Sequence, residues 1–306
     1  MRTLLLSSLP IILLTSFGLG LSSNAAADTL QNGNTIGTGG AAIAAVADDA
    51  SIELNPAGLG MTERYDFSIA AQNIAGGYAL GGKVVDSRTG KFGFGVSYRY
   101  GQTNDLTAAG GLPGWVSSGE DPSNIVESHQ LVAAAGLPFF DRKLSVGMSG
   151  SGAWLDSANR GLTNTFDMGL GLTARPLNWL AIGLVGADLL NLEGLEAKNA
   201  SVAGGVQVGH KFGQLVADVR WTSGMAEISA LSVHTGAELF INNARLRVGY
   251  LQLGPTDFSA FTWGIGTQNT AGGFEYAMLM PIDGQGNIQH TVSMRIRTPQ
   301  KSRLRM

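Results

Sequence analysis

The stretch from Lys91 to Tyr100, KFGFGVSYRY, alternates strictly between two kinds of side chain. Phenylalanine, valine or tyrosine stands at every second position, beginning with Phe92. Lysine, glycine, serine and arginine fill the positions between them. A period of two is that of a β-strand, whose successive side chains point to opposite faces. Because the second face holds mostly small residues, the stretch predicts a strand with lipid on one side and a crowded interior on the other.

The same alternation recurs along most of the chain. We predict fourteen strands, at residues 65–73, 77–86, 91–101, 127–137, 143–155, 164–175, 179–188, 200–211, 214–222, 229–240, 244–253, 257–267, 273–281 and 287–297. Every second connection is a short turn, and the two longest, 102–126 and 189–199, fall on the opposite side. A soluble sandwich also alternates, but its polar faces usually carry many lysines and glutamates. The pattern therefore predicts an all-β fold, a transmembrane antiparallel β-barrel of about fourteen strands spanning residues 64–297.

The composition agrees with this fold class. The chain has 306 residues, 44 of them glycine, which is about twice the usual share of roughly 7%. Charged residues make up 14%, against a typical value of about 25%, which argues against a disordered chain. There are 20 basic and 23 acidic residues, so no basic excess suits a nucleic-acid partner. With no cysteine, a disulfide scaffold and a cysteine zinc site are excluded.

Both ends differ from the barrel. Residues 1–27 predict an export signal: Arg2 precedes an apolar run from Leu4 to Leu21, and Ala25 to Ala27 supplies the small residues of a cleavage site. The alternative is a membrane-anchoring helix, which Pro10 and the polar residues after it disfavour. No run of about 20 apolar residues follows. Residues 298–306 form a basic C-terminal tail.

Residues 28–63 do not alternate, and we predict that they form an N-terminal plug inside the barrel. The alanine-rich stretch from Gly39 to Ala50 favours a short helix. Asn55 to Gly58 then predicts a turn, in which Pro56 fixes the backbone. A lumen of fourteen strands is too wide for side chains alone to fill. The alternative is a disordered leader.

Two short motifs in this segment resemble a known family. Ala47-Asp48-Asp49-Ala50-Ser51, followed by Asn55-Pro56-Ala57-Gly58-Leu59, is similar to the N-terminal signature of the outer-membrane long-chain fatty acid transporter (FadL) superfamily. That superfamily includes toluene-type hydrocarbon channels and shorter PorV-like barrels of type IX secretion. The resemblance implies a fourteen-stranded barrel with an N-terminal hatch. It assigns the plug and gating role to Asn55, Pro56 and Ala57.

The external loops are shorter than the resemblance implies. In the fatty acid transporters, large outer loops form a first hydrophobic groove. Here only residues 102–126 are long enough, and Leu112, Trp115 and Val116 are the candidate substrate-binding residues. The chain also lacks the terminal aromatic residue typical of outer-membrane barrels.

The interior face carries charges but no catalytic pattern. No G-x-S-x-G, H-E-x-x-H or P-loop motif is present, and the four histidines lie on separate predicted strands, so we predict no enzyme activity, no metal site and no cofactor. The predicted inward charges are Lys83, Arg99, Arg175, Arg220, Arg245, Arg247, Arg295, Asp66, Asp167, Asp218, Glu238 and Glu275. Their balance favours pairs that hold the plug over an ion-selective ring. The small interior residues also lead us to expect that serine at Gly171 is tolerated.

These patterns support two functional hypotheses. The first is a channel in the outer membrane of a Gram-negative cell, which passes small hydrophobic molecules such as long-chain fatty acids. It predicts an apolar pocket where plug meets barrel, and a gap or kink in the wall. The alternative is a non-transporting, PorV-like barrel that serves as a secretion partner or scaffold, with a sealed polar lumen. The expected partners are outer-membrane lipid, hydrophobic small molecules, the barrel assembly machinery and, for the alternative, secretion components.

Overall fold

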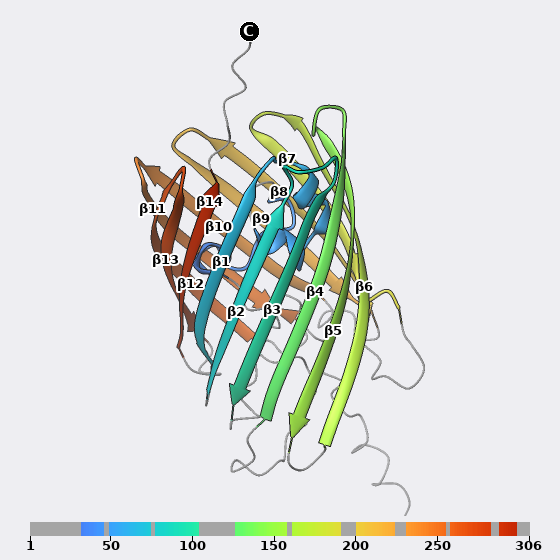
Figure 1. Ribbon diagram of the computed structural model, residues 1–306. Helices are drawn as coiled ribbons and strands as arrows, with labels where there is room; N and C mark the ends of the chain where they lie inside the picture. Colours follow the sequence, from blue (N-terminus) through green and yellow to red (C-terminus); the bar gives the residue numbers. More distant parts are fainter. Residues whose placement is uncertain are drawn as a thin grey trace, which may run out of the picture.

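The computed structural model describes residues 32–45, 49–74, 77–103, 126–157, 161–190, 200–223, 231–254, 258–282 and 288–298. Within them, fourteen antiparallel strands close into one barrel, with β1 paired to β14 (Figure 1). The strands are β1 (Tyr65–Ile74), β2 (Gly77–Asp86), β3 (Gly93–Thr103), β4 (Val126–Phe139), β5 (Leu144–Ser157), β6 (Gly161–Leu177), β7 (Leu180–Ala187), β8 (Ser201–His210), β9 (Gly213–Thr222), β10 (Leu231–Ile241), β11 (Ala244–Leu253), β12 (Phe258–Asn269), β13 (Gly272–Pro281) and β14 (Gln289–Thr298). The predicted fourteen-stranded barrel is confirmed.

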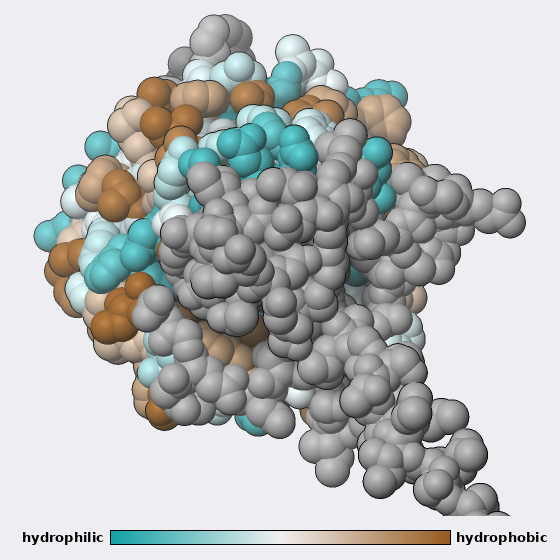
Figure 2. Space-filling view, turned by 90° about the horizontal axis from the view of Figure 1, so that it is seen from below, coloured by the Kyte–Doolittle hydropathy of each residue, from teal (hydrophilic) through white to brown (hydrophobic). Residues whose placement is uncertain are grey.

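The alternation has the predicted orientation. On β6, the Leu170 side chain is 54% exposed, whereas Asp167 and Thr173 on the same strand are buried. Figure 2 looks along the barrel from the end toward which β3 and β5 run, and at its left and top hydrophobic residues are spaced along the outer circumference. Every strand carries at least one exposed large hydrophobic side chain. Apolar side chains exposed all round a closed barrel suit a lipid environment. The closed ladder leaves no edge strand, so the strands' backbone groups bond to one another.

Aromatic residues near the strand ends also face outward. Tyr65, Tyr78, Tyr98 and Trp221 are 42–50% exposed. Tyr98 Oη lies 2.8 Å from His129 Nδ1, and the His129 ring stacks on Trp154. Amphipathic rings of this kind form girdles where a barrel wall meets the membrane surface.

Short turns connect the strands at the end where β1 begins. Two of them use left-handed backbone at residues other than glycine, with φ of 49° to 64° from Phe140 to Arg142 and 55° at Asn242. The register between β6 and β7 shifts between Ala174 and Leu177. Pro176 lies in that interval and has no N–H to contribute to the ladder, which accounts for the break.

One of the two expectations about the N-terminal segment needs revision. The helix predicted for residues 39–50 is wrong for the described residues: α1 spans Gly33–Gly37, Ala41 to Ala45 is non-helical, and η1 (Asp49–Ile52) is a 3₁₀ turn. Tertiary contacts described below bind the N–H groups of Ala42 and Ile43, and they override alanine's helix propensity. The predicted turn from Asn55 to Gly58 is present, since Gly58 N donates to Asn55 O at 3.0 Å, and it continues as a second 3₁₀ helix, η2 (Pro56–Gly60).

Several predictions fall outside the described residues. These are the export signal at residues 1–27, the loop residues Leu112, Trp115 and Val116, and the basic tail beyond Thr298. Among the residues that the structure describes, no helix is both long and apolar enough to cross a membrane.

The outward orientation of Leu170 generates a stability prediction. Leu170→Arg should lower the free energy of unfolding in lipid vesicles by about 2–4 kcal/mol, because it places a charge in hydrocarbon midway along β6. Ser151→Arg is the matched control, since it adds the same charge on the interior face of β5, opposite Asp167. The unfolding free energy of both variants would be measured by denaturant titration, with the folded fraction read from heat-modifiability on gels. Equal losses of stability would contradict the assigned orientation.

Candidate functional site

The N-terminal segment, defined as the described residues between Asn32 and Met61, lies inside the barrel. Its helix α1 packs against β11 to β14, whereas η2 packs against β3 to β6. These two groups of strands lie on different sides of the closed ring. The segment therefore extends across the lumen from one wall to the other.

Asn55 uses one end of its side-chain amide within the segment and the other to join the segment to the wall. Its Oδ1 accepts a hydrogen bond from Ala57 N at 3.2 Å and caps η2. Its Nδ2 donates to Ile43 O at 2.7 Å and to Thr173 Oγ1 on β6 at 3.1 Å. An aspartate could cap the helix but could not donate these bonds. The motif residues are thus together at the surface where η2 meets the wall.

Pro56 and Ala57 serve close packing. Pro56 stands at the first position of η2, where a missing N–H leaves no bond unmade. Ala57 is fully buried beside β5. A Cβ added at Gly136 on β4 would lie 2.8 Å from Pro56 O.

The wall meets the segment on a belt of interior glycines. At each of these positions a Cβ would come into tight contact with, or overlap, an atom of the N-terminal segment. They lie on β3 to β8 and β10 to β12, and are Gly93, Gly95, Gly136, Gly147, Gly171, Gly183, Gly205, Gly236, Gly249 and Gly264. The high glycine content therefore has a local purpose, which is to let two backbones approach closely.

The glycine belt overturns one sequence expectation. A Cβ at Gly171 would overlap Asn55 Oδ1, so even the small serine side chain does not fit without displacing Asn55. The space that small interior residues leave is already filled by the segment.

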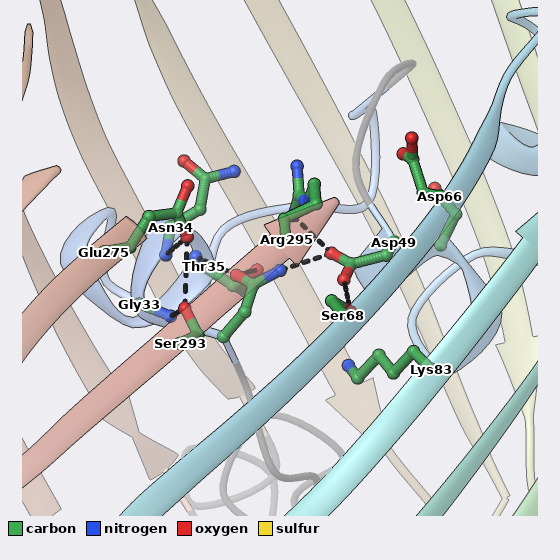
Figure 3. A network of polar contacts seen from close by, with 12 residues as sticks. Gly33, Asn34, Thr35, Asp49, Asp66, Ser68, Lys83, Glu275, Ser293 and Arg295 are labelled. Carbon is green, nitrogen blue, oxygen red and sulfur yellow. Dashed lines mark hydrogen bonds and ion pairs between the residues drawn. The ribbon is translucent and has the colours of Figure 1, made fainter. Parts of the chain in front are cut away.

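Asp49 fixes the segment to β1 and β14. Its side chain is fully buried, and its Oδ1 lies 2.6 Å from Arg295 Nη2 on β14. It also accepts hydrogen bonds from Asn32 Nδ2 and from Ser68 Oγ on β1. Figure 3 shows Asp49 between Arg295 and Ser68. A buried carboxylate held by a cation and neutral donors is satisfied, and removing it would leave Arg295 with one fewer counter-charge.

A second acidic residue, Asp218 on β9, binds backbone amides. Its Oδ2 accepts from Ala42 N at 2.6 Å and from Ile43 N at 2.9 Å. N–H groups that bond to this carboxylate are not available to the carbonyls four residues earlier, which an α-helix continuing through these residues would require. This contact is the reason why the alanines form a turn.

Helix α1 is held by a chain of polar groups. Asn34 N donates to Glu275 Oε2 on β13 at 3.0 Å, and Gly33 N donates to Ser293 Oγ at 3.0 Å, as the left of Figure 3 shows. Arg247 Nη2 lies 3.3 Å from Glu275 Oε1 and 2.8 Å from Glu238 Oε1. On β2, Lys83 pairs with Glu53 of the segment at 2.5 Å. The prediction that interior charges form pairs and hold the segment is confirmed for these residues.

Gly39 ends this part of the segment with a positive φ of 70°. Its N donates to Thr262 Oγ1 at 3.0 Å, and its O lies 2.8 Å from His234 Nδ1. A side chain here would be strained by the backbone conformation and would overlap the carbonyls of Thr235 and Tyr250.

The chain leaves the lumen at a buried ion pair. Arg64 Nε lies 3.3 Å from Asp66 Oδ2, and Arg297 on β14 also binds Asp66, at 2.8 Å. Burial lowers the pKa of the Arg64 guanidinium, and the negative charge of Asp66 opposes that shift. This pair fixes the point at which the segment becomes β1.

Apolar contacts complete the junction. Ile52 and Leu59 pack against Val85, Val132 and Ala134 on β2 and β4. Ile43 and Leu54 pack against Val185 and Ala203 on β7 and β8. A separate buried apolar cluster, Leu251, Leu253 and Ala260, lies on the interior faces of β11 and β12.

The wall itself is continuous where it is described. The pairs from β1 to β6 show no register shift. An apolar groove of about 700 Å³ lies over β1–β3 and β13–β14, on the outer side where Ile69, Tyr98 and Met294 are exposed. The channel hypothesis predicts a gap or kink in the wall. The irregularity in the described wall is the register break between β6 and β7 near Pro176. No group of three or more His, Asp or Glu suited to a metal ion occurs in the described part of the chain.

Sequence reasoning identified Asn55, Pro56 and Ala57 but missed Asp49 and Asp218 as anchors of the segment. Asp218 stood among the expected inward charges, yet its partners are backbone amides, which no residue type reveals. Leu112, Trp115 and Val116 lie outside the described residues, so their role stays a prediction.

Comparison with known proteins places the fold. No protein-family model and no curated protein sequence matches the chain. Among solved structures, it is similar to the CymD monoaromatic hydrocarbon channel, with a TM-score of 0.61 and 14% identity over 88% of this chain and 97% of that one. A FadL homologue of Pseudomonas aeruginosa gives 0.61 and 11% over 87% and 98%, and the P. putida toluene transporter TodX gives 0.59 and 12% over 88% and 99%. The chain therefore has the fold of the FadL-type channels, as the motif resemblance implied.

The glycine belt predicts that small substitutions dislodge the segment. Gly171→Ala should increase hydrogen exchange at the amides of residues 55–60, because the new methyl group overlaps Asn55. The barrel should stay folded, since alanine favours a strand over glycine. Gly152→Ala on β5 is the control, because nothing lies within 4 Å of its added Cβ. If residues 55–60 showed the same hydrogen exchange in both variants, the position of the segment would not depend on the glycine belt.

Proposed function

We propose that the protein is a member of the FadL-type superfamily that works in the outer membrane of a Gram-negative cell as a channel for small hydrophobic molecules. In this proposal the N-terminal segment is its plug. The solved structures with the same fold are described as a monoaromatic hydrocarbon channel and a toluene transporter, which supports a hydrophobic solute of that size. Long-chain fatty acids are the larger candidate.

The observation that carries the proposal is the asymmetry of the plug's contacts. On the side of β13, β14, β1 and β2, charged groups hold it: Asp49 with Arg295, Glu275 with Asn34, and Lys83 with Glu53. On the side of β3 to β6, the contacts are glycine packing, apolar side chains and the neutral hydrogen bonds of Asn55. Arg142 in the β4–β5 turn also donates to Gly60 O at 2.6 Å, but among the described residues no ion pair joins η2 to these strands. Breaking a buried ion pair leaves an unpaired charge and costs about 3–5 kcal/mol, whereas a neutral hydrogen bond contributes about 0.5–1.5 kcal/mol.

This asymmetry supports a hinged motion. The α1 side remains anchored, and η2 moves away from β3–β6 about it. The surfaces that this motion would expose are apolar, since Ile52, Leu59, Val132 and Ala134 line them. A hydrophobic solute could contact these apolar surfaces without giving up hydrogen bonds of its own to water. A polar solute would lose such bonds and find no partners there. The apolar cluster at Leu251 and Leu253 adds a second hydrophobic surface to the interior wall.

The competing hypothesis is the PorV-like scaffold. It requires the plug to remain closed, and it places function in contacts with secretion components. Binding to those components and to the barrel assembly machinery remains a prediction. Permeability separates the two hypotheses, because only the channel needs a plug that moves.

Loosening the plug tests the proposal. Asn55→Ala combined with Pro56→Gly should leave heat-modifiability intact, because this turn is not part of the strand ladder. It should change uptake of a hydrophobic dye in whole cells several-fold. Asn269→Ala is the matched control, since Asn269 Oδ1 also accepts backbone bonds, from Ala271 and Gly272, but in the β12–β13 turn.

Unchanged uptake of both hydrophobic and polar probes, at normal protein levels, would contradict gating and favour the scaffold. Uptake that changes equally in the Asn269 control would show a general effect of turn substitutions.

A further inference from the structure

A cavity of about 410 Å³ opens at the short-turn end of the barrel. Its lining includes Arg175, Trp179, Ala181, Gln207, Lys211 and Gln214, from β6 to β9 and the turns between them. Arg175, Ala181, Gln207 and Gln214 occupy interior positions of their strands. This volume lies within the usual range of small-molecule sites.

The charges in this cavity are unbalanced. Among the residues that the structure describes, it is lined by Arg175, His210 and Lys211 and by no acidic residue. Arg175 Nη2 donates to Asn178 O at 2.6 Å, which holds the guanidinium at the wall, and Lys211 Nζ lies 4.7 Å from the centre of the Phe212 ring. Neither cation forms an ion pair with a described residue. By contrast, Lys83, Arg247 and Arg295 all have carboxylate partners.

The apolar part of the lining is separate from the charges. Trp179 is 53% exposed at the cavity, beside Leu180 and Ala181. An indole face packs against an alkyl chain or a ring at little entropic cost, because the side chain has two rotatable bonds. The cavity thus offers cationic donors together with an apolar surface.

The cavity lies next to the plug. Two residues beyond Ala181 on β7, Gly183 meets the carbonyl of Ile43, to which Asn55 also bonds. On its other wall, Gln207 bonds to Gln214, whose Nε2 donates to Glu238 Oε2 at 2.7 Å. Glu238 forms an ion pair with Arg247, and Arg247 also pairs with Glu275. Glu275 in turn accepts a hydrogen bond from Asn34 N of α1. A ligand here would contact residues that are linked to both attachments of the plug.

We propose that this cavity is a binding site for a small organic anion, a carboxylate carried on a short apolar group. Arg175 and Lys211 bind the carboxylate, and Trp179 packs against the apolar group. The site goes beyond the proposed hydrophobic route, because charge selects its ligand. Its test is direct binding to the purified protein, so it can fail while hydrophobic uptake succeeds, and the reverse.

Hexanoate and its neutral isostere hexanamide are the probes. The full chain in lipid nanodiscs would be titrated with each, while tryptophan fluorescence and calorimetry are recorded. Hexanoate should bind saturably and change the emission, and that change should be absent in Trp179→Phe. Hexanamide should bind about fivefold more weakly, because it cannot form the charge-assisted bonds. Added salt should weaken hexanoate binding.

Charge variants locate the site. Arg175→Gln and Lys211→Gln should each weaken hexanoate binding about fivefold. Lys91→Gln, an exposed lysine in the β2–β3 turn, should leave it unchanged. Lys211 lies in an exposed turn, so its variant carries the test if Arg175→Gln does not fold. Equal affinity for the acid and the amide, unchanged binding in both charge variants, or no saturable signal would overturn the proposal.

Discussion

Closure of the hydrogen-bonded ladder between β1 and β14 is the constraint on which the rest of this molecule depends. Within lipid, an unpaired backbone group costs several kcal/mol, so a sheet can cross only if it has no edge. The pairing of Tyr65 with Thr298 and its successors removes the edge. With the backbone satisfied in the strands, the side chains are free to alternate between lipid and lumen. Closure at fourteen strands then sets the lumen's width.

That width creates a second requirement, which the N-terminal segment meets. Side chains alone do not fill a lumen of this size. A backbone brought inside carries its own polar groups, and each needs a partner. Asp218 binds the amides of Ala42 and Ile43, and Thr262 binds that of Gly39. The glycine belt lets the segment come close enough for these bonds. In the proposed function, anchoring mainly by charge on one side and by packing on the other would allow one rigid barrel to contain a movable part.

The strands were predictable from sequence because two different solvents enforce the alternation at every position. Leu170 and Asp167 differ in exposure for that reason alone. Pro176 was visible too, although its effect on the β6–β7 register was not foreseen. The segment was harder. Alanine propensity placed a helix where Asp218 holds a turn, and the motif identified Asn55 without its partner Thr173. Those partners depend on how the segment fits against the wall, which local sequence does not encode. The expectation that Gly171 tolerates serine failed for the same reason. The small interior residues were taken to leave free space, whereas the N-terminal segment packs directly against them.

The central claim is that η2, together with Ile52 at the end of η1, moves away from β3–β6 to open a hydrophobic path, while Asp49 at the start of η1 stays bound to Arg295. The chain has no cysteine, so an introduced pair would be the only thiols. Gly95 and Ile52 suit such a pair, because a Cβ at Gly95 would lie 2.6 Å from Ile52 Cγ1. Hydrophobic-dye flux would be measured in proteoliposomes containing Gly95→Cys with Ile52→Cys, first oxidised and then reduced. The account predicts that oxidation stops the flux and reduction restores it, while each single cysteine variant responds to neither. Flux that continues unchanged with the cross-link formed would contradict it.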